Sequence, residues 1–292
     1  MIMSTALKNA IMNIVIAHMA WDYTETLTKY SYLDQGAFDF ISFTQNPAYQ
    51  WYMREIEILI NMNVGNSYQQ ILDLGPGNGM KWLALIQAMS NQLHKYIALD
   101  ISTQMLNIAR QHQETISYVQ RCYIQEDFDD FTRFHTHRDR KSLFMMLGNT
   151  ITNLVDMQNY LNIFFAMFHK EDMFLVWVEI RDNENVHSLV EEYNTPENRR
   201  LTFRPLEYIG VPQTAWYVNI LFNPQKRRIE ERFIFGKEIY LDNFHVPIDA
   251  RVLLSVTNKP TLEEFISDIQ TSGFIIQQIC NNHQQYIFAV SK

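Results

Sequence analysis

Cysteine is scarce in this sequence, and the two that it has, Cys122 and Cys280, are too few for a disulfide framework or a cysteine zinc site. The nine histidines show no HExxH or similar ligand spacing, so we expect no metal. A long apolar run is also missing. Residues 1–20 carry a helical apolar stripe that Asn9 and Asn13 interrupt, which predicts neither a transmembrane helix nor a signal peptide. We therefore expect a cytoplasmic protein that is not bound to a membrane.

The chain has no excess of positive charge either. Its net charge is −8, which argues against a nucleic-acid partner because such partners usually require a basic face. With 292 residues, 47% of them hydrophobic and 19% charged, the composition is typical of a globular protein that buries a large core. We expect a monomer whose partner is a small molecule.

From residue 69 onward, short apolar runs alternate with helical stretches. This alternation predicts crossover units and a mostly parallel sheet with helices on both faces, an α/β fold. The expected strands are QQILDL, KYIALD, SYVQRCYI, SLFMML and MFLVWVEI, and the expected helices include 102–113 and 156–168.

After residue 180 the pattern changes to charged stretches followed by AWYVNILF, RRIEERFIF and ARVLLSV, which predict an inserted antiparallel unit. A helix in PTLEEFISDIQTSGF and two closing strands, FIIQQIC and QYIFAVSK, then rejoin the sheet. The predicted organisation is a helical part of a substrate cap at 1–64, a nucleotide-binding core at 65–180 and 259–292, and an inserted α+β part of the cap at 181–258.

The segment ILDLGPGNG at 71–79 places three alternating glycines between a strand and a helix. Glycine lets the backbone pass close to a ligand, and the helix N-terminus offers unpaired N–H groups to an anion. A dinucleotide site would prefer GxGxxG, so this spacing favours S-adenosylmethionine over NAD; a tight turn without ligand is the alternative. The residues singled out for the cofactor are Asp73, Gly75, Gly77 and Lys81.

Two further acidic residues follow expected strands. Asp100 ends the second strand, where a carboxylate can accept both hydroxyls of a ribose. The third strand runs into QEDFDDF, in which Asp127 and Phe128 can bind an adenine amino group and stack on its ring. Spacing alone is equally compatible with Asp127 as a helix N-cap.

The segment LFMMLGNTITNL at 143–154 resembles the "LGSTIGN"-like turn of the histidine Nα-methyltransferase family of ergothioneine biosynthesis. Upstream, KYSYLDQGAFDFISFTQNPAYQWYMREIEIL at 29–59 is similar to that family's Y-D-x-x-G-S-x-L-F-x-x-I-T-x-x-P-E-Y-Y-P-T-R-T-E-x-x-I-L segment. The resemblance covers 29–180 well and 181–292 loosely. It implies a Rossmann-like class I methyltransferase core, S-adenosylmethionine as the cofactor, and methyl transfer to the α-amino group of an amino acid.

The resemblance also implies roles for individual residues. Gly75 and Lys81 would hold the methionine end of the cofactor, Asp100 its ribose, and Asp127 with Phe128 its adenine. Gly148 would lie in the turn beneath the transferable methyl group. The residues implied for the substrate are Tyr32, Phe40, Tyr49, Asn149, Asn153 and Tyr193, with Tyr32 and Asn153 orienting the amine as the catalytic residues.

Near the C-terminal end the sequence departs from the family, which has T-E-V-S-C-K-F where this chain has LSVTNKP. With Val256 and Lys259 setting the register, Ser255 replaces the Glu and Thr257 the Ser of the substrate site. Thr152 likewise stands where the turn motif has Gly. A side-chain pocket without a carboxylate would favour a large apolar or aromatic group, so we expect histidine to be a poor substrate.

Three functions therefore stay open from the sequence. The first is an S-adenosylmethionine-dependent transferase that N-methylates an amino acid or an amino-acid-derived molecule other than histidine. The second is a methyltransferase that tailors a natural product with an amino-acid-like end. The third is a non-catalytic module that binds S-adenosylmethionine.

Overall fold

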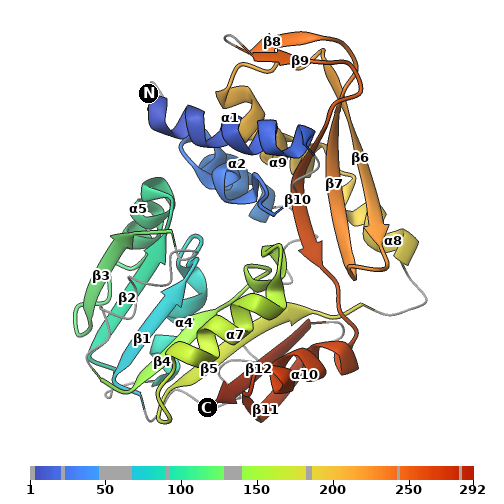
Figure 1. Ribbon diagram of the computed structural model, residues 1–292. Helices are drawn as coiled ribbons and strands as arrows, with labels where there is room; N and C mark the ends of the chain where they lie inside the picture. The colour runs from blue at the N-terminus through green and yellow to red at the C-terminus, as the bar shows by residue number, and fades with distance from the viewer. Residues whose placement is uncertain are drawn as a thin grey trace. The chain divides into compact units, whose positions relative to one another are not determined.

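The computed structural model describes residues 4–20, 24–45, 68–89, 93–127, 140–181, 186–241, 244–282 and 285–292. The chain divides into two compact units (Figure 1). Unit 1 comprises residues 1–43 and 183–259, and unit 2 comprises residues 44–182 and 260–292. None of the helices in the described ranges has the length and apolar character needed to span a membrane.

Unit 2 is built on a seven-stranded sheet. Its strands are β1 (Gln70–Leu74), β2 (Lys95–Asp100), β3 (Gln120–Gln125), β4 (Ser142–Met146), β5 (Met173–Glu179), β11 (Ile275–Asn282) and β12 (Gln285–Ser291). They lie in the order β11-β12-β5-β4-β1-β2-β3. The first five are parallel to one another, whereas β12 is antiparallel to both β5 and β11. The predicted α/β fold and the return of the closing strand pair to the sheet are therefore confirmed.

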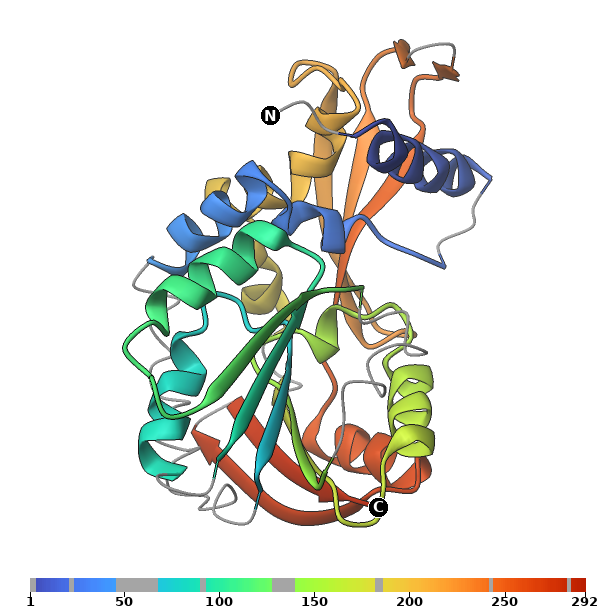
Figure 2. The same ribbon diagram turned by 90° about the vertical axis from the view of Figure 1, so that its left-hand side faces the viewer.

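Helices cover both faces of this sheet. They are α4 (Met80–Met89), α5 (Thr103–His112), the 3-10 turn η5 (Ile151–Asn153), α7 (Met157–Met167) and α10 (Leu262–Thr271). Figure 2 shows α4 and α5 on one face, and α7 and α10 on the other. The sequence starts α10 with a capping box, in which Thr261 and Glu264 exchange hydrogen bonds between side chain and backbone.

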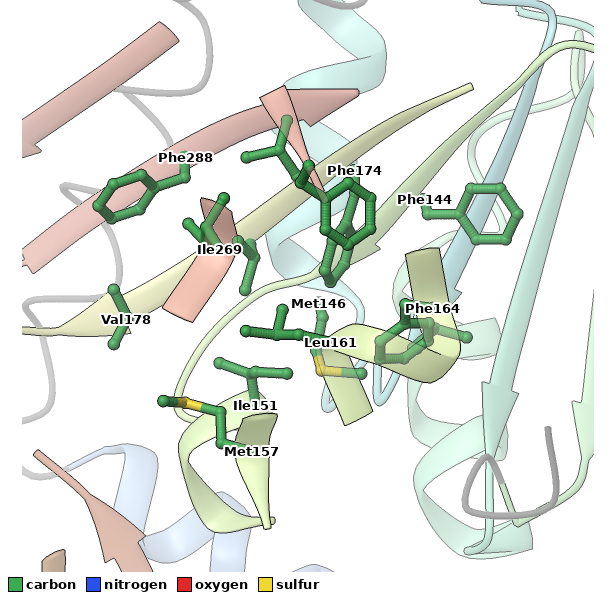
Figure 3. Packing of buried hydrophobic residues seen from close by; sticks show 14 of the residues in the cluster. Phe144, Met146, Ile151, Met157, Leu161, Phe164, Phe174, Val178, Ile269 and Phe288 are labelled. Atoms are coloured by element: carbon green, nitrogen blue, oxygen red, sulfur yellow. The ribbon is translucent and has the colours of Figure 1, made fainter. Parts of the chain in front are cut away.

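Alternate residues of the strands pack toward these two layers, as the pleat of a strand requires. Ile71 of β1 belongs to a core cluster with Trp82 of α4. Its neighbour Leu72 belongs instead to the cluster with Phe164 of α7, and Figure 3 shows part of that second cluster. Because both faces are covered, β1, β4 and β5 are almost wholly buried, and β4 and β5 are nearly continuous apolar runs, which is the pattern that made them predictable.

Unit 1 combines N-terminal helices with an antiparallel sheet. Its helical elements are α1 (Thr5–Met19), η1 (Thr28–Tyr32), α2 (Gln35–Thr44), α8 (Val186–Tyr193) and α9 (Pro196–Tyr208). Its strands are β6 (Trp216–Asn223), β7 (Arg228–Phe235), β10 (Arg251–Asn258) and a short hairpin of β8 (Ile239–Leu241) and β9 (Phe244–Val246). The order β10-β7-β6, antiparallel throughout, confirms the antiparallel unit predicted after residue 180.

A β-bulge interrupts β10 where it pairs with β7. Leu253 lies opposite Arg232 and Ser255 lies opposite the next residue of β7, Glu231, so Leu254 is extra. Two contacts from the N-terminal segment hold the bulge. The backbone N–H of Leu253 donates to Nδ1 of His18 at 3.2 Å, and the backbone N–H of Leu27 donates to the carbonyl of Leu254 at 3.0 Å.

Candidate functional site

The glycine-rich loop joins β1 to α4 in unit 2. Gly75, Gly77 and Gly79 have φ values of 72°, 60° and 74°, in the left-handed region where a Cβ is strained. A Cβ on Gly79 would also lie 2.9 Å from the Cβ of Ala109. The alternating glycines are therefore required by the path of the backbone, and they bring the loop past the ends of β1 and β2, where Gly75 N–H donates to Leu99 O at 2.9 Å.

Asp73 lies buried on β1 just before this loop. The hydroxyl of Tyr96 donates a hydrogen bond of 2.8 Å to its Oδ2. Burial raises the pKa of Asp73 to about 7, while the Tyr96 bond and the charge of Lys81 act in the opposite direction. Sequence reasoning missed Tyr96, although a tyrosine within the apolar run KYIALD is a polar group that needs a buried partner.

Asp100 ends β2 beside the same loop. The backbone N–H of Ser102 donates to its Oδ1 at 2.8 Å. Burial, with the nearby charge of Asp73, raises the pKa of Asp100 to about 7. Unit 2 thus holds two neighbouring buried carboxylates at the carboxyl ends of adjacent parallel strands, the edge at which open α/β sheets bind ligands.

The next strand end carries Asp127, which is half-buried. The backbone N–H of Glu126 donates to the carbonyl of Asp100 at 3.1 Å, so the end of β3 is tied to the end of β2. Asp127 therefore follows the strand that pairs with the strand of Asp100. Phe128 lies outside the described residues.

The turn after β4 contains three of the predicted residues. Gly148 has a φ of 75°, and the hydroxyl of Thr152 donates to the carbonyl of Asn149 at 2.8 Å. The backbone N–H of Asn153 donates to the same carbonyl at 3.1 Å. The side-chain Oδ1 of Asn149 is buried and has no hydrogen-bond partner in the described part of the chain. The turn therefore presents a neutral acceptor that a bound N–H group can satisfy.

In unit 1 the rings of Tyr32 and Phe40 meet edge to face, with centroids 5.2 Å apart. Gly36 makes this arrangement possible, because a Cβ there would lie only 1.9 Å from the carbonyl oxygen of Ser31. The predicted substrate residue Tyr49 lies outside the described residues.

The remaining predicted substrate residues gather on one side of the unit 1 sheet. The amide of Asn198 donates to the carbonyl of Tyr193 at 2.9 Å and to Oε1 of Glu231 at 3.0 Å. Ser255 lies directly opposite Glu231 in the β10–β7 pairing, and Thr257 is two residues further along β10 on the same side. We call Tyr193, Asn198, Glu231, Ser255 and Thr257 the Glu231 cluster.

One expectation from the sequence is wrong here. The replacement of the family's Glu by Ser255 predicted a pocket without a carboxylate. In the structure, however, Glu231 lies directly opposite Ser255 on the neighbouring strand. Glu231 is part of the alternating segment RRIEERFIF, and the sequence does not show which residue of β10 it faces. Among the residues that the structure describes, no three His, Cys, Asp or Glu side chains are grouped to hold a metal ion.

A family model described as "Histidine-specific methyltransferase, SAM-dependent" matches residues 13–291. The chain belongs to this family. No curated protein matches the sequence. Because the family match spans both units, the protein is an S-adenosylmethionine-dependent methyltransferase, and S-adenosylmethionine is its cofactor.

Solved structures agree on the fold. An O-methyltransferase family protein from Burkholderia thailandensis is similar with a TM-score of 0.55 and 7% identity, over 98% of this chain and 70% of that one. Human N-acetylserotonin methyltransferase, solved with S-adenosylmethionine, has a TM-score of 0.51 and 12% identity, over 98% of this chain and 66% of that one. PigF, solved with S-adenosylhomocysteine, has a TM-score of 0.51 and 11% identity, over 98% of this chain and 68% of that one. This likeness shows the class I methyltransferase fold of the chain and nothing about its substrate.

Proposed function

We propose that this enzyme N-methylates the α-amino group of an amino acid or of a small molecule derived from one. The observation that carries the proposal is the buried, unpartnered Oδ1 of Asn149 in the turn after β4. An unpaired buried acceptor costs free energy unless a ligand donor satisfies it, and an amine supplies an N–H donor. The family description, which names histidine, also supports an amino-acid substrate.

The cofactor residues in this proposal are those around the glycine loop. Gly75 and Gly77 let the backbone N–H groups approach the methionine end, and Lys81 pairs with its carboxylate. Asp100 accepts the ribose hydroxyls, with Asp73 beside it, and Gly148 borders the methyl group. When bound, S-adenosylmethionine supplies a methyl group activated by its sulfonium. The residues fit this cofactor, because hydroxyl groups that donate to the two buried carboxylates, whose pKa values are about 7, would stabilise their ionised forms. Asp127 and Phe128 are proposed for the adenine.

The amine needs positioning more than it needs a base. A neutral amine already carries the attacking lone pair, so orientation and exclusion of water can supply most of the rate enhancement. The groups proposed to orient it, Tyr32, Asn149 and Asn153, are neutral at pH 7 and do not stabilise the ammonium form. Phe40, in contact with Tyr32, would shield the amine from water. Tyr49 and Tyr193 are proposed for the head group.

We also propose that histidine is not the preferred substrate. Ser255 and Thr257 stand where the family segment has Glu and Ser, so any carboxylate must approach the side chain from another strand. An imidazole placed for the family's glutamate would then lie at the wrong distance and angle for a strong hydrogen bond.

A screen of proteinogenic and modified amino acids tests the proposal, with S-adenosylhomocysteine release and product mass as the readouts. We expect a mass increase that fragmentation assigns to the α-nitrogen. Methylation of hydroxyl compounds with no activity on any amine would contradict it.

A second candidate is the methylation of a natural product with an amino-acid-like end, which the departure at Ser255 also permits. The pH profile separates amine from oxygen acceptors. For an amine, kcat/KM rises with pH until the α-amino group, which titrates near about 7.7–8.0 in peptides, is mostly neutral. A profile that falls between about pH 6.5 and 8.5, an interval that contains this range, would favour an oxygen acceptor.

A further inference from the structure

Glu231 is a buried carboxylate that the protein leaves incompletely bonded. Its exposed fraction is 2%, and Asn198 donates to its Oε1 at 3.0 Å. Its Oε2 is buried and has no hydrogen-bond partner in the described part of the chain. Burial raises the pKa of Glu231, although side-chain hydrogen bonds from Asn198, Ser255 and Thr202 act in the opposite direction. Burial therefore makes the charged form of this side chain unfavourable in the absence of a further partner.

The preceding residue shows what a fully bonded glutamate looks like on the same strand. Glu230 points to the other side of the sheet, where Arg228 donates to its Oε1 at 2.9 Å and Arg232 pairs with its Oε2. Asn223 donates to Oε1 as well, at 3.1 Å. These ion pairs hold the pKa of Glu230 below its usual value despite burial.

No comparable counter-ion forms an ion pair with Glu231 among the described residues. The cation whose charge acts on it, Arg199, is exposed and donates its own hydrogen bond to Asn194. A buried charge without a counter-ion usually persists only where a ligand or a reaction needs it. Glu231 therefore has the character of a group that awaits a donor.

Its neighbours indicate what that donor belongs to. Tyr193, Ser255 and Thr257 are the residues that the family resemblance assigns to the substrate, and the bulge at Leu254 places Ser255 opposite Glu231. Asn198 joins Tyr193 to Glu231 through one amide group. The Glu231 carboxylate thus lies among the unit 1 residues proposed to recognise the substrate. Its strand, β7, pairs with β10, which carries most of the segment LSVTNKP that differs from the family sequence.

We propose that Glu231 binds the side-chain end of the substrate, and that this end carries a cation or a strong N–H donor. The inference rests on the proposed methylation of an amino acid. A donor to Oε2 would complete the hydrogen bonding of the carboxylate, and a cation would neutralise it. The preferred substrates are then basic amino acids, such as lysine, ornithine or arginine, and the large apolar side chains expected from Ser255 are disfavoured.

The test measures binding and turnover of matched amino-acid pairs, lysine against norleucine and arginine against citrulline. Binding is measured by calorimetry with S-adenosylhomocysteine present, and turnover by product mass. Each pair keeps the chain length nearly constant and changes the charge. We expect wild type to prefer the cationic member of at least one pair.

Glu231→Gln removes the charge and keeps the size of the side chain. A charged hydrogen bond contributes about 1.5–3 kcal/mol, so affinity for the cationic member should fall about 10- to 100-fold. Affinity for the neutral member should stay within about twofold, a difference of under 0.5 kcal/mol. The matched control is Glu238→Gln, because Glu238 is an exposed glutamate of unit 1 and its removal should change neither affinity.

A second variant separates recognition from a structural role. Residues opposite each other on antiparallel strands have Cβ atoms about 4.5–5.5 Å apart. Glu231→Ser should therefore abolish the preference for the cation, and adding Ser255→Glu should restore part of it. A structural role predicts instead that both members of a pair weaken equally and that the second substitution restores nothing.

The outcomes distinguish the two proposals. If wild type methylates amino acids but prefers the neutral members, or if Glu231→Gln affects both members alike, Glu231 does not read the side chain and the proposed N-methylation stands. If wild type neither binds nor methylates any compound in the screen of proteinogenic and modified amino acids, the proposed function fails, and this inference fails with it.

Discussion

The hydroxyl of Tyr96 on β2 donates a 2.8 Å hydrogen bond to Oδ2 of Asp73 on β1, and both side chains are buried. The bond links two adjacent parallel strands just where the glycine loop leaves the sheet. It also opposes the effect of burial on the pKa of Asp73, which is nevertheless raised to about 7. The carboxylate next to the proposed cofactor site is thus held by a single phenol.

Tyr96→Phe should destabilise the protein, and more at high pH than at low pH. Removing the donor leaves Oδ2 of Asp73 without its partner, which costs about 1–3 kcal/mol when the carboxylate is ionised. Urea unfolding at pH 6 and pH 8.5 measures the difference. An equal loss at both pH values would mean that the cost comes from packing and not from the carboxylate.

The pH dependence of stability should reflect Asp100 as well. Its folded-state pKa is about 7, against an ordinary value of 3.8, so the folded state binds more protons than the unfolded chain between these values. The stability contributed by the protonated form is complete below pH 3.8 and is lost as the pH rises toward 7. Asp100→Asn should flatten this part of the profile for the ligand-free protein. An unchanged profile would show that Asp100 is not the titrating group.

Cofactor binding should have the opposite pH dependence. Ribose hydroxyls donate to the ionised carboxylate, so affinity for S-adenosylmethionine should rise from pH 6 to pH 8, on either side of the Asp100 pKa of about 7, with release of a proton. Calorimetry in two buffers of different ionisation enthalpy detects that proton. In Asp100→Asn the proton release should decrease and the affinity should fall about 10- to 100-fold, the loss of a charged hydrogen bond.

Asn153→Ala should lower kcat/KM on every accepted amino acid by a similar factor, because the residue is proposed to hold the head group that all of them share. Affinity for the cofactor should not change. Asn159→Ala, at an exposed position of α7, is the matched control. A substrate-dependent loss would move Asn153 from the head group to the side chain.

Gly36→Ala should destabilise the N-terminal part of unit 1. The added Cβ would lie 1.9 Å from the Ser31 carbonyl oxygen, so the backbone must shift, at about 1–3 kcal/mol for overpacking. Gly236→Ala is the control, since a Cβ there would lie 3.8 Å from its nearest neighbour, the carbonyl oxygen of Ala215. Thermal unfolding compares the two variants. A destabilisation of 1 kcal/mol normally lowers Tm by more than about a degree. A Tm for Gly36→Ala within about a degree of the control would therefore contradict the steric requirement.

The parts of the fold that the sequence predicted are those with a strong local pattern. The buried parallel strands β4 and β5 are nearly continuous apolar runs, and the glycines at 75, 77 and 79 mark a turn that only they can adopt easily. By contrast, α9 was not predicted, because its charged residues and the internal Pro205 conceal a stripe that includes Leu201 and Leu206. Local composition does not show that this stripe packs on a sheet.

The site was predictable to a similar extent. Asp73 and Asp100 follow from their places at strand ends, whereas Tyr96 and Glu231 act through partners on other strands. Only pairing register shows such contacts, and register depends on turns and bulges that the sequence does not mark clearly. The segment LSVTNKP contains no carboxylate of its own. The carboxylate beside it, Glu231, belongs to the neighbouring strand β7.

The extra residue at Leu254 changes the phase of β10. Val252 and Ser255 lie opposite Phe233 and Glu231, so residues three apart share one side of the sheet, while a regular strand would alternate. Deleting Leu254 would make the strand regular without changing this pairing, because Leu253 would still lie opposite Arg232 and Ser255 opposite Glu231. The deletion would instead remove the carbonyl group that accepts the hydrogen bond from the backbone N–H of Leu27. The extra residue therefore provides an attachment point for the N-terminal segment and leaves the side of the sheet that Ser255 and Thr257 share with Glu231 unchanged.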